Sequence, residues 1–263
     1  MNRRNFIKSA SGLFVPATFG IFVPKLSAQF SRTPAFKAAA VPKVAGGGGD
    51  GSFAFSYVTG TAIGTSPSVT HSPTVGNLVV FYAKWEGTGD MTDVSSNAST
   101  PDVFTLLTQS NHNNGDIHSR IGWKVIANAG ANILTGTWTG TPTFRRIRVV
   151  EFSKAGGTVA VDAGIYPTTP STTGTSFTTS GPGTLTTTTN NSLVICTYAE
   201  YASGLPTSPQ IGGVSATMFP GNLDDGSSQL WYRILTATIA GASGTATVAD
   251  DAWVGQLVAW KST

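Results

Sequence analysis

The sequence predicts an all-β fold, a β-sandwich of jelly-roll type built from two similar halves. Among 263 residues, 31 Gly, 14 Pro and 38 Thr indicate many short strands joined by turns. No stretch after Ser52 keeps a helical apolar period over about 12 residues. In addition, strand-like segments recur in the same order in two parts of the chain, which indicates a duplicated unit.

The charge of the chain is concentrated at its start. The formal net charge is +3, but from Ser52 onward 9 Lys and Arg stand against 12 Asp and Glu, a balance of about −3. The remaining basic cluster is Arg145, Arg146 and Arg148, too few to neutralise the several phosphates that nucleic-acid binding requires. We therefore expect no nucleic-acid partner.

Residues 1–28 predict an export signal peptide. A basic start precedes an apolar stretch at 9–23, and small residues lie before Gln29. Because this stretch has about 15 residues and contains Pro16, it predicts no permanent membrane span.

The motif Arg3-Arg4-Asn5-Phe6-Ile7-Lys8 resembles the twin-arginine signal of bacteria, in which two Arg precede any residue, Phe, an aliphatic residue and Lys. The resemblance implies that the folded protein is exported to the periplasm, the cell surface or the medium. An ordinary secretory signal with an accidental arginine pair is the alternative. The single cysteine, Cys196, excludes a disulfide within the chain and is expected to be a buried, inert thiol.

The body of the chain follows a linker. Residues 29–51 are rich in Pro, Ala and Lys and end in a run of glycines, which predicts a flexible tether. We expect the folded domain at 52–263, with half one at 52–155 and half two at 156–263.

The two halves share three sequence matches. The matching segments are 76–83 with 191–198, 122–126 with 231–235, and 148–152 with 256–260. A duplicated unit would place Lys124 opposite Arg233 and Val150 opposite Val258. Chance similarity between strands rich in Thr and Val is the alternative.

Half one predicts strands at 103–109, 117–127 and 133–139, with Asn114-Gly115 as a hairpin turn. We expect both halves to contribute strands to both sheets of the sandwich. This pattern resembles the concanavalin-like and jelly-roll domains of secreted bacterial and phage-encoded proteins, which implies the same fold.

The acidic residues do not predict a catalytic site. Glycoside hydrolysis needs two carboxylates that face one cleft, and the three Glu after Ser52, namely Glu86, Glu151 and Glu200, lie far apart in sequence. The clustered acids of concanavalin-like glucanases are missing. We expect no catalytic residues, and Glu151 to lie on a solvent face beside an arginine.

Asp90, Asp93 and Asn97 are the candidates for a Ca²⁺ loop, because carboxylate and amide oxygens suit this ion. No other cofactor is expected. A predicted hairpin tip carries three further potential ligands, His112, Asp116 and His118. We interpret that tip as solvated rather than metal-binding.

Trp85, Glu86, Glu200 and Tyr201 are the candidate ligand-binding residues. Each aromatic residue neighbours an acid where a strand gives way to a loop, a place that favours exposure. An exposed ring can stack on a sugar face while carboxylates bind hydroxyl groups. Packing of Trp85 in the core is the alternative.

From these observations we rank three functions, with the one that the sequence favours most given first. The first is an exported, non-catalytic binding module for polysaccharide or the cell surface. The second is a structural assembly protein of a phage particle, a decoration or fibre component that contacts copies of itself in the virion. The third is a glycan-active enzyme, a hydrolase or lyase.

Overall fold

The all-β prediction is confirmed. The described residues of the computed structural model form nineteen strands and no helix, and all belong to one compact unit. None of them forms a helix that could cross a bilayer. The predicted signal, the linker and the Asn114-Gly115 turn lie outside the described residues. The described ranges are 53–58, 62–64, 67–112, 117–128, 130, 132–166, 173–179, 183–201, 204–219 and 227–263.

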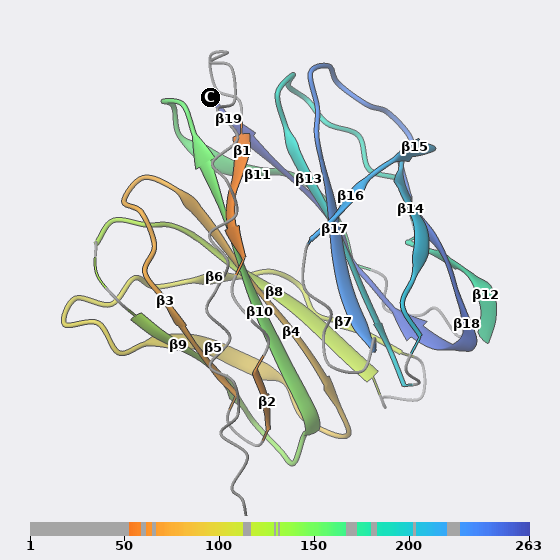
Figure 1. Ribbon diagram of the computed structural model, residues 1–263, viewed down its shortest axis with the longest axis horizontal. Coiled ribbons are helices and arrows are strands. Elements are labelled where there is room, and N and C mark those ends of the chain that lie inside the picture. The colour runs from red at the N-terminus through yellow and green to blue at the C-terminus, as the bar shows by residue number, and fades with distance from the viewer. Residues whose placement is uncertain are drawn as a thin grey trace, which may run out of the picture. The chain divides into compact units, whose positions relative to one another are not determined.

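Half one contains two antiparallel sheets (Figure 1). Inner sheet one has the strand order β1-β10-β4-β8-β6, with β2 on β10 and β7 on β8. Outer sheet one has the order β3-β9-β5. The strand bounds are β1 Phe53–Val58, β2 Ala62–Gly64, β3 Ser68–His71, β4 Leu78–Glu86, β5 Met91–Ser96, β6 Thr105–Leu106, β7 Ser110–Asn111, β8 Ile117–Val125, β9 Asn132–Trp138 and β10 Thr143–Lys154.

Half two also contains two antiparallel sheets. Inner sheet two has the order β11-β19-β13-β17-β16, and outer sheet two has the order β12-β18-β14-β15. A short pairing of β13 with β18 links these two sheets. The strand bounds are β11 Val159–Ile165, β12 Thr173–Thr178, β13 Leu193–Glu200, β14 Thr207–Ile211, β15 Val214–Ser215, β16 Thr217–Met218, β17 Ser228–Ile234, β18 Gly244–Val254 and β19 Leu257–Ser262.

The central strands β4 and β13 are buried on both faces. Alternate side chains of a strand point to opposite faces. In β4, Phe81 packs with outer sheet one, whereas Val80 packs with Ile195 of half two. In β13, Cys196 packs with outer sheet two. The two inner sheets therefore pack on each other, and each is covered on its other face by an outer sheet.

The structure differs from the sequence prediction in how the sheets are composed. Among the described residues, every sheet contains strands of one half only. A sandwich of two sheets covers only one face of each sheet. Strands β4 and β13 are buried on both faces, so each inner sheet needs a layer on both sides. The strand predicted at 103–109 is also shorter, because only β6 pairs there.

The pairing register in the two inner sheets is the same. The pairs are Lys124 with Val79, Val150 with Val80, Arg233 with Val194, and Val258 with Ile195. Because Val79 and Val194 are both the second residue of their strands, Lys124 and Arg233 hold corresponding places, as do Val150 and Val258. Descent of the halves from one unit stays a prediction, which superposition of one half on the other would test.

Polar side chains also join the halves. The Tyr82 hydroxyl donates to the carbonyl of Tyr198 at 2.9 Å, and Arg146 donates to the Ser227 hydroxyl at 2.7 Å. Arg148 donates to the side-chain oxygen of Gln229. Both arginines are buried, so the basic cluster noted in the sequence mainly lies inside the protein.

Candidate functional site

Trp85 is buried, with 0% of its surface exposed. Its ring stacks on His118 at a centroid distance of 5.4 Å and meets the edge of Trp138 at 6.1 Å. Its indole nitrogen donates to the carbonyl of Gly89 at 2.9 Å. The exposure that a sugar-stacking ring needs is not observed, because position 85 shares the face of β4 that outer sheet one covers.

The other three candidates differ in exposure. Glu86 pairs with the buried Lys84, and Glu200 is fully buried and accepts from the backbone of Gly204 at 2.9 Å. Tyr201 is 42% exposed. Of the four residues proposed as a ligand site, Tyr201 alone therefore presents a substantially exposed ring.

The candidate Ca²⁺ residues are engaged separately along β5 and its ends. Asp90 accepts from Gln109 at 2.9 Å, and Asn97 accepts from the Ile133 amide at 2.6 Å. Asp93 accepts from the amide of its own neighbour, Val94. In the part of the chain that the structure describes, no three His, Cys, Asp or Glu side chains form a metal-binding group.

His118 does not lie at a solvated tip. It is 7% exposed, its Nδ1 lies 2.7 Å from Asn111 Oδ1, and its Nε2 lies 2.8 Å from the carbonyl of Gly87. His112 is buried as well, and Asp116 is outside the described residues. The prediction of a solvated hairpin tip is therefore wrong for the two histidines.

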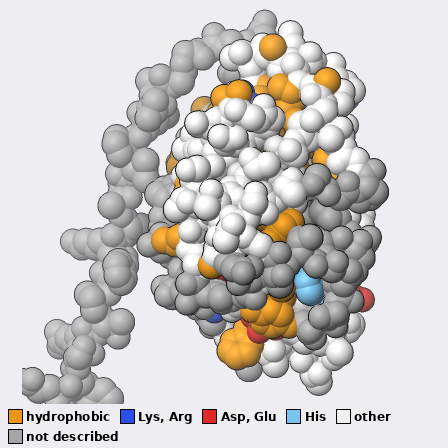
Figure 2. All heavy atoms as spheres, turned by 90° about the vertical axis from the view of Figure 1, so that its right-hand side faces the viewer, with side chains coloured by type: hydrophobic (Ala, Val, Ile, Leu, Met, Phe, Trp, Pro, Cys, Tyr) orange, Lys and Arg blue, Asp and Glu red, His pale blue; other side chains and the backbone are white. Residues whose placement is uncertain are grey.

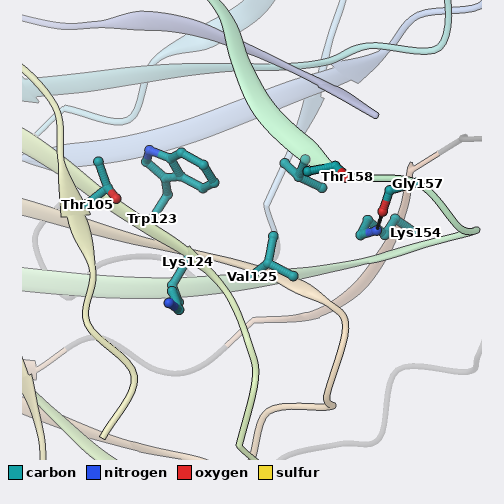
Figure 3. A pocket seen from close by; sticks show the side chains of 8 residues that line it. Thr105, Trp123, Lys124, Val125, Lys154, Gly157 and Thr158 are labelled. Atoms are coloured by element: carbon teal, nitrogen blue, oxygen red, sulfur yellow. Dashed lines mark hydrogen bonds between the residues drawn. The ribbon is translucent and has the colours of Figure 1, made fainter. Parts of the chain in front are cut away.

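One open pocket, here called the Trp123 pocket, has a volume of about 350 Å³ (Figure 3). Its lining comes from β6, β8, the end of β10 and the start of β11. Figure 3 shows the Trp123 ring between Thr105 and Thr158, while Lys124 points away from the ring. The lining residues are Thr105, Trp123, Lys124, Val125, Lys154, Gly157, Thr158 and Val159.

The polar groups around Trp123 leave room for a ligand. The indole nitrogen is buried and has no hydrogen-bond partner among the described residues. Thr105 and Thr158 are exposed, and Lys154 donates to the backbone carbonyls of Gly156 and Gly157. No carboxylate side chain lines this pocket.

A second pocket, here called the Glu151 pocket, has a volume of about 440 Å³. At its base His71 and Glu151 are 3% and 2% exposed, and His71 Nε2 lies 2.8 Å from Glu151 Oε2. The rest of its lining is the hydroxyl-bearing residues Ser56, Thr70, Ser72 and Thr74. Glu151 therefore lies inside the protein beside a histidine, and the prediction of a solvent-face acid beside an arginine is wrong.

Burial raises the pKa of Glu151, but its hydrogen bonds outweigh that effect. The donors are His71, the Thr74 amide at 3.0 Å and the Asn77 side chain at 2.5 Å. As a result the pKa lies below its ordinary value, and the carboxylate stays ionised at neutral pH.

No family model, curated protein or solved structure matches this chain. The candidate sites therefore stand on their own geometry. Sequence reasoning missed Trp123 as a pocket residue. It also missed the contact between His71 and Glu151, for which the sequence carries no signal.

Proposed function

We propose that this protein is an exported, non-catalytic module that binds polysaccharide or the cell surface, with the Trp123 pocket as its binding site. The observation that carries the proposal is a half-buried indole in an open pocket between two exposed threonine hydroxyls. A flat apolar ring stacks on the apolar face of a sugar, and hydroxyl groups at the rim replace hydrogen bonds to water.

The chemistry of the pocket supports binding rather than turnover. Its lining contains neither a carboxylate nor a histidine that could act as an acid or base. Lys154 donates to two backbone carbonyls and has one N–H left for a hydroxyl or carboxylate group of a glycan. The export signal that the sequence predicts would bring the pocket into contact with such polymers.

Pull-down on a panel of insoluble polysaccharides tests the proposal with Trp123→Leu, which keeps apolar bulk but removes the flat ring. We expect the variant to lose retention while its melting temperature changes little. Trp138→Leu is the matched control, because Trp138 is also a half-buried tryptophan of half one but lies outside the pocket. Equal retention of Trp123→Leu and the unmodified protein on every polymer would contradict the proposal.

A second candidate function is the structural assembly protein of a phage particle, and the outer face of outer sheet two favours it. Figure 2 shows that charged side chains are few on this side of the molecule. A row of hydroxyl groups crosses three strands there, through Ser176, Thr247 and Thr207. A regular face with few charges suits repeated contacts between copies. Sedimentation that stays monomeric at high concentration would oppose this function.

A further inference from the structure

We propose that the Glu151 pocket is a second binding site, separate from the Trp123 pocket, and that it takes an amino sugar through its ammonium and hydroxyl groups. No residue lines both pockets. Along β10, Glu151 shares the face of Val149 toward outer sheet one, whereas Lys154 of the Trp123 pocket lies on the opposite face. The inference therefore does not depend on the proposed role of Trp123.

The carboxylate of Glu151 has one acceptor position left. An ionised carboxylate accepts about four hydrogen bonds. Oε1 accepts from the Thr74 amide and from Asn77, and Oε2 faces His71. Because Glu151 lines the pocket, the remaining position on Oε2 is available to a donor that enters it.

The charge of the Glu151 carboxylate favours a positively charged donor on the ligand. No lysine or arginine lines the Glu151 pocket, and Glu151 contributes an ionised carboxylate at its base. An ammonium group makes a charge-assisted hydrogen bond to a carboxylate, which is about twice as strong as a bond between neutral groups. A ligand with a primary ammonium group therefore fits this position better than a neutral alcohol.

The hydroxyl-bearing residues that line the rest of the Glu151 pocket favour a ligand with several hydroxyl groups. Ser56, Thr70, Ser72 and Thr74 are all exposed, and their hydroxyl groups make no hydrogen bond to any described residue. Four open hydroxyls and no aromatic ring favour a polyhydroxylated ligand over an alkyl chain. The volume of about 440 Å³ lies within the range of small-molecule pockets.

Calorimetry and amide chemical shifts with three probes test the assignment. Glucosamine carries both features, glucose lacks the ammonium group, and butylammonium lacks the hydroxyl groups. We expect glucosamine to bind about tenfold more tightly than either of the others and to shift the amides of Thr70, Ser72 and Thr74. Equal affinity for glucose, or no binding of any probe, would overturn the proposal. Equal affinity for butylammonium would replace the amino sugar by an alkyl ammonium ligand, such as a lysine side chain.

Four variants show where glucosamine binds. Glu151→Gln should bind glucosamine and glucose equally, whereas Asp93→Asn, the same charge change at an exposed site, should keep the preference. Ser72→Phe fills the pocket from its exposed wall and should abolish binding even if Glu151→Gln does not fold. Trp123→Leu should bind glucosamine normally, so failure of the polysaccharide proposal and failure of this one give different results. Unchanged binding in folded Glu151→Gln or Ser72→Phe would refute the site.

Discussion

Trp123 in β8 and Tyr232 in β17 hold the same place in their inner sheets, opposite Val80 and Ile195. Tyr232 is enclosed by other rings: its centroid lies 5.7 Å from Phe55, and it also packs on Phe152 and Phe219. Trp123 packs against the same core cluster but also lines an open pocket. The same position of the fold therefore supports the core in both halves, and in half one it also contributes to a candidate binding surface.

The ionisable residues show the same contrast. Glu151 pairs with Val79, and the residue that pairs with the corresponding Val194 is Ala259. Lys84 likewise corresponds to Ala199, seventh in both central strands. The comparison indicates that half one supplies the carboxylate of the Glu151 pocket, whereas the Trp123 pocket takes its lining from both halves, with Thr158 from half two.

The largest expected effect tests whether the two halves fold as one. Trp85 and Trp231 are fully buried in separate core clusters, one in each half. Trp85→Ala and Trp231→Ala should each lower the free energy of unfolding by about 3–5 kcal/mol. Because a third cluster joins the inner sheets, both variants should shift one common transition in urea. Two transitions, each sensitive to one substitution, would show that the halves unfold independently.

The burial of Trp85 shows where sequence reasoning was limited. The strands themselves were predictable, because runs such as 78–86 are almost continuously apolar. That continuity also indicates burial on both faces, and Trp85 follows Phe81 and Ala83 on one of them. The place of Trp85 at a strand end was a weaker indication of its exposure than its alternation with Phe81 and Ala83, which share its face of β4.

The contact between His71 and Glu151 could not be predicted from the sequence. It depends on how outer sheet one lies on inner sheet one, and that arrangement is set by tertiary packing rather than by any local pattern. A lone acid between Val150 and Phe152 is compatible with a solvated face or a buried partner. Which of the two applies depends on the residues that pack against Glu151 in the folded protein.

An effect of intermediate size on stability is expected at Glu151, whose counterpart in half two is the uncharged Ala259. Because the pKa of Glu151 is lowered in the folded protein, its ionised form contributes stability above the ordinary pKa of Glu, about 4.3, and this contribution is lost as the pH falls through the lowered value. Glu151→Gln should reduce the free energy of unfolding by about 1–3 kcal/mol at neutral pH.

Urea unfolding between neutral and acidic pH measures this prediction. The difference between the unmodified protein and Glu151→Gln should shrink as the pH falls below the lowered pKa, because protonation makes Glu151 neutral, as glutamine already is. Asp93→Asn is the control for a charge change on the surface of half one. A difference that stays constant at every pH would show that the charge of Glu151 does not stabilise the fold.

The smallest expected effect concerns a part of half one that half two lacks. The turns before the central strands correspond, with Gly76 at φ 86° and Asn191 at φ 58°, and both residue types tolerate this left-handed conformation. Strand β10, however, starts at Thr143, whereas β19 starts only at Leu257, which corresponds to Val149. This extension contains a bulge with Phe144 at φ 44° and 63% exposed.

Phe144 therefore adopts a conformation that a bulky residue rarely takes, and it gains little burial in return. A left-handed conformation costs a residue with a Cβ about 1–2 kcal/mol, and the greater freedom of unfolded glycine offsets part of that cost. Phe144→Gly should raise the free energy of unfolding by about 0.5–1 kcal/mol relative to Phe144→Ala, which loses the same ring but keeps the Cβ atom. Equal urea midpoints for the two variants would contradict the strain. A loss of polysaccharide retention in both, with stability unchanged or improved, would instead show that the projecting ring of half one serves binding.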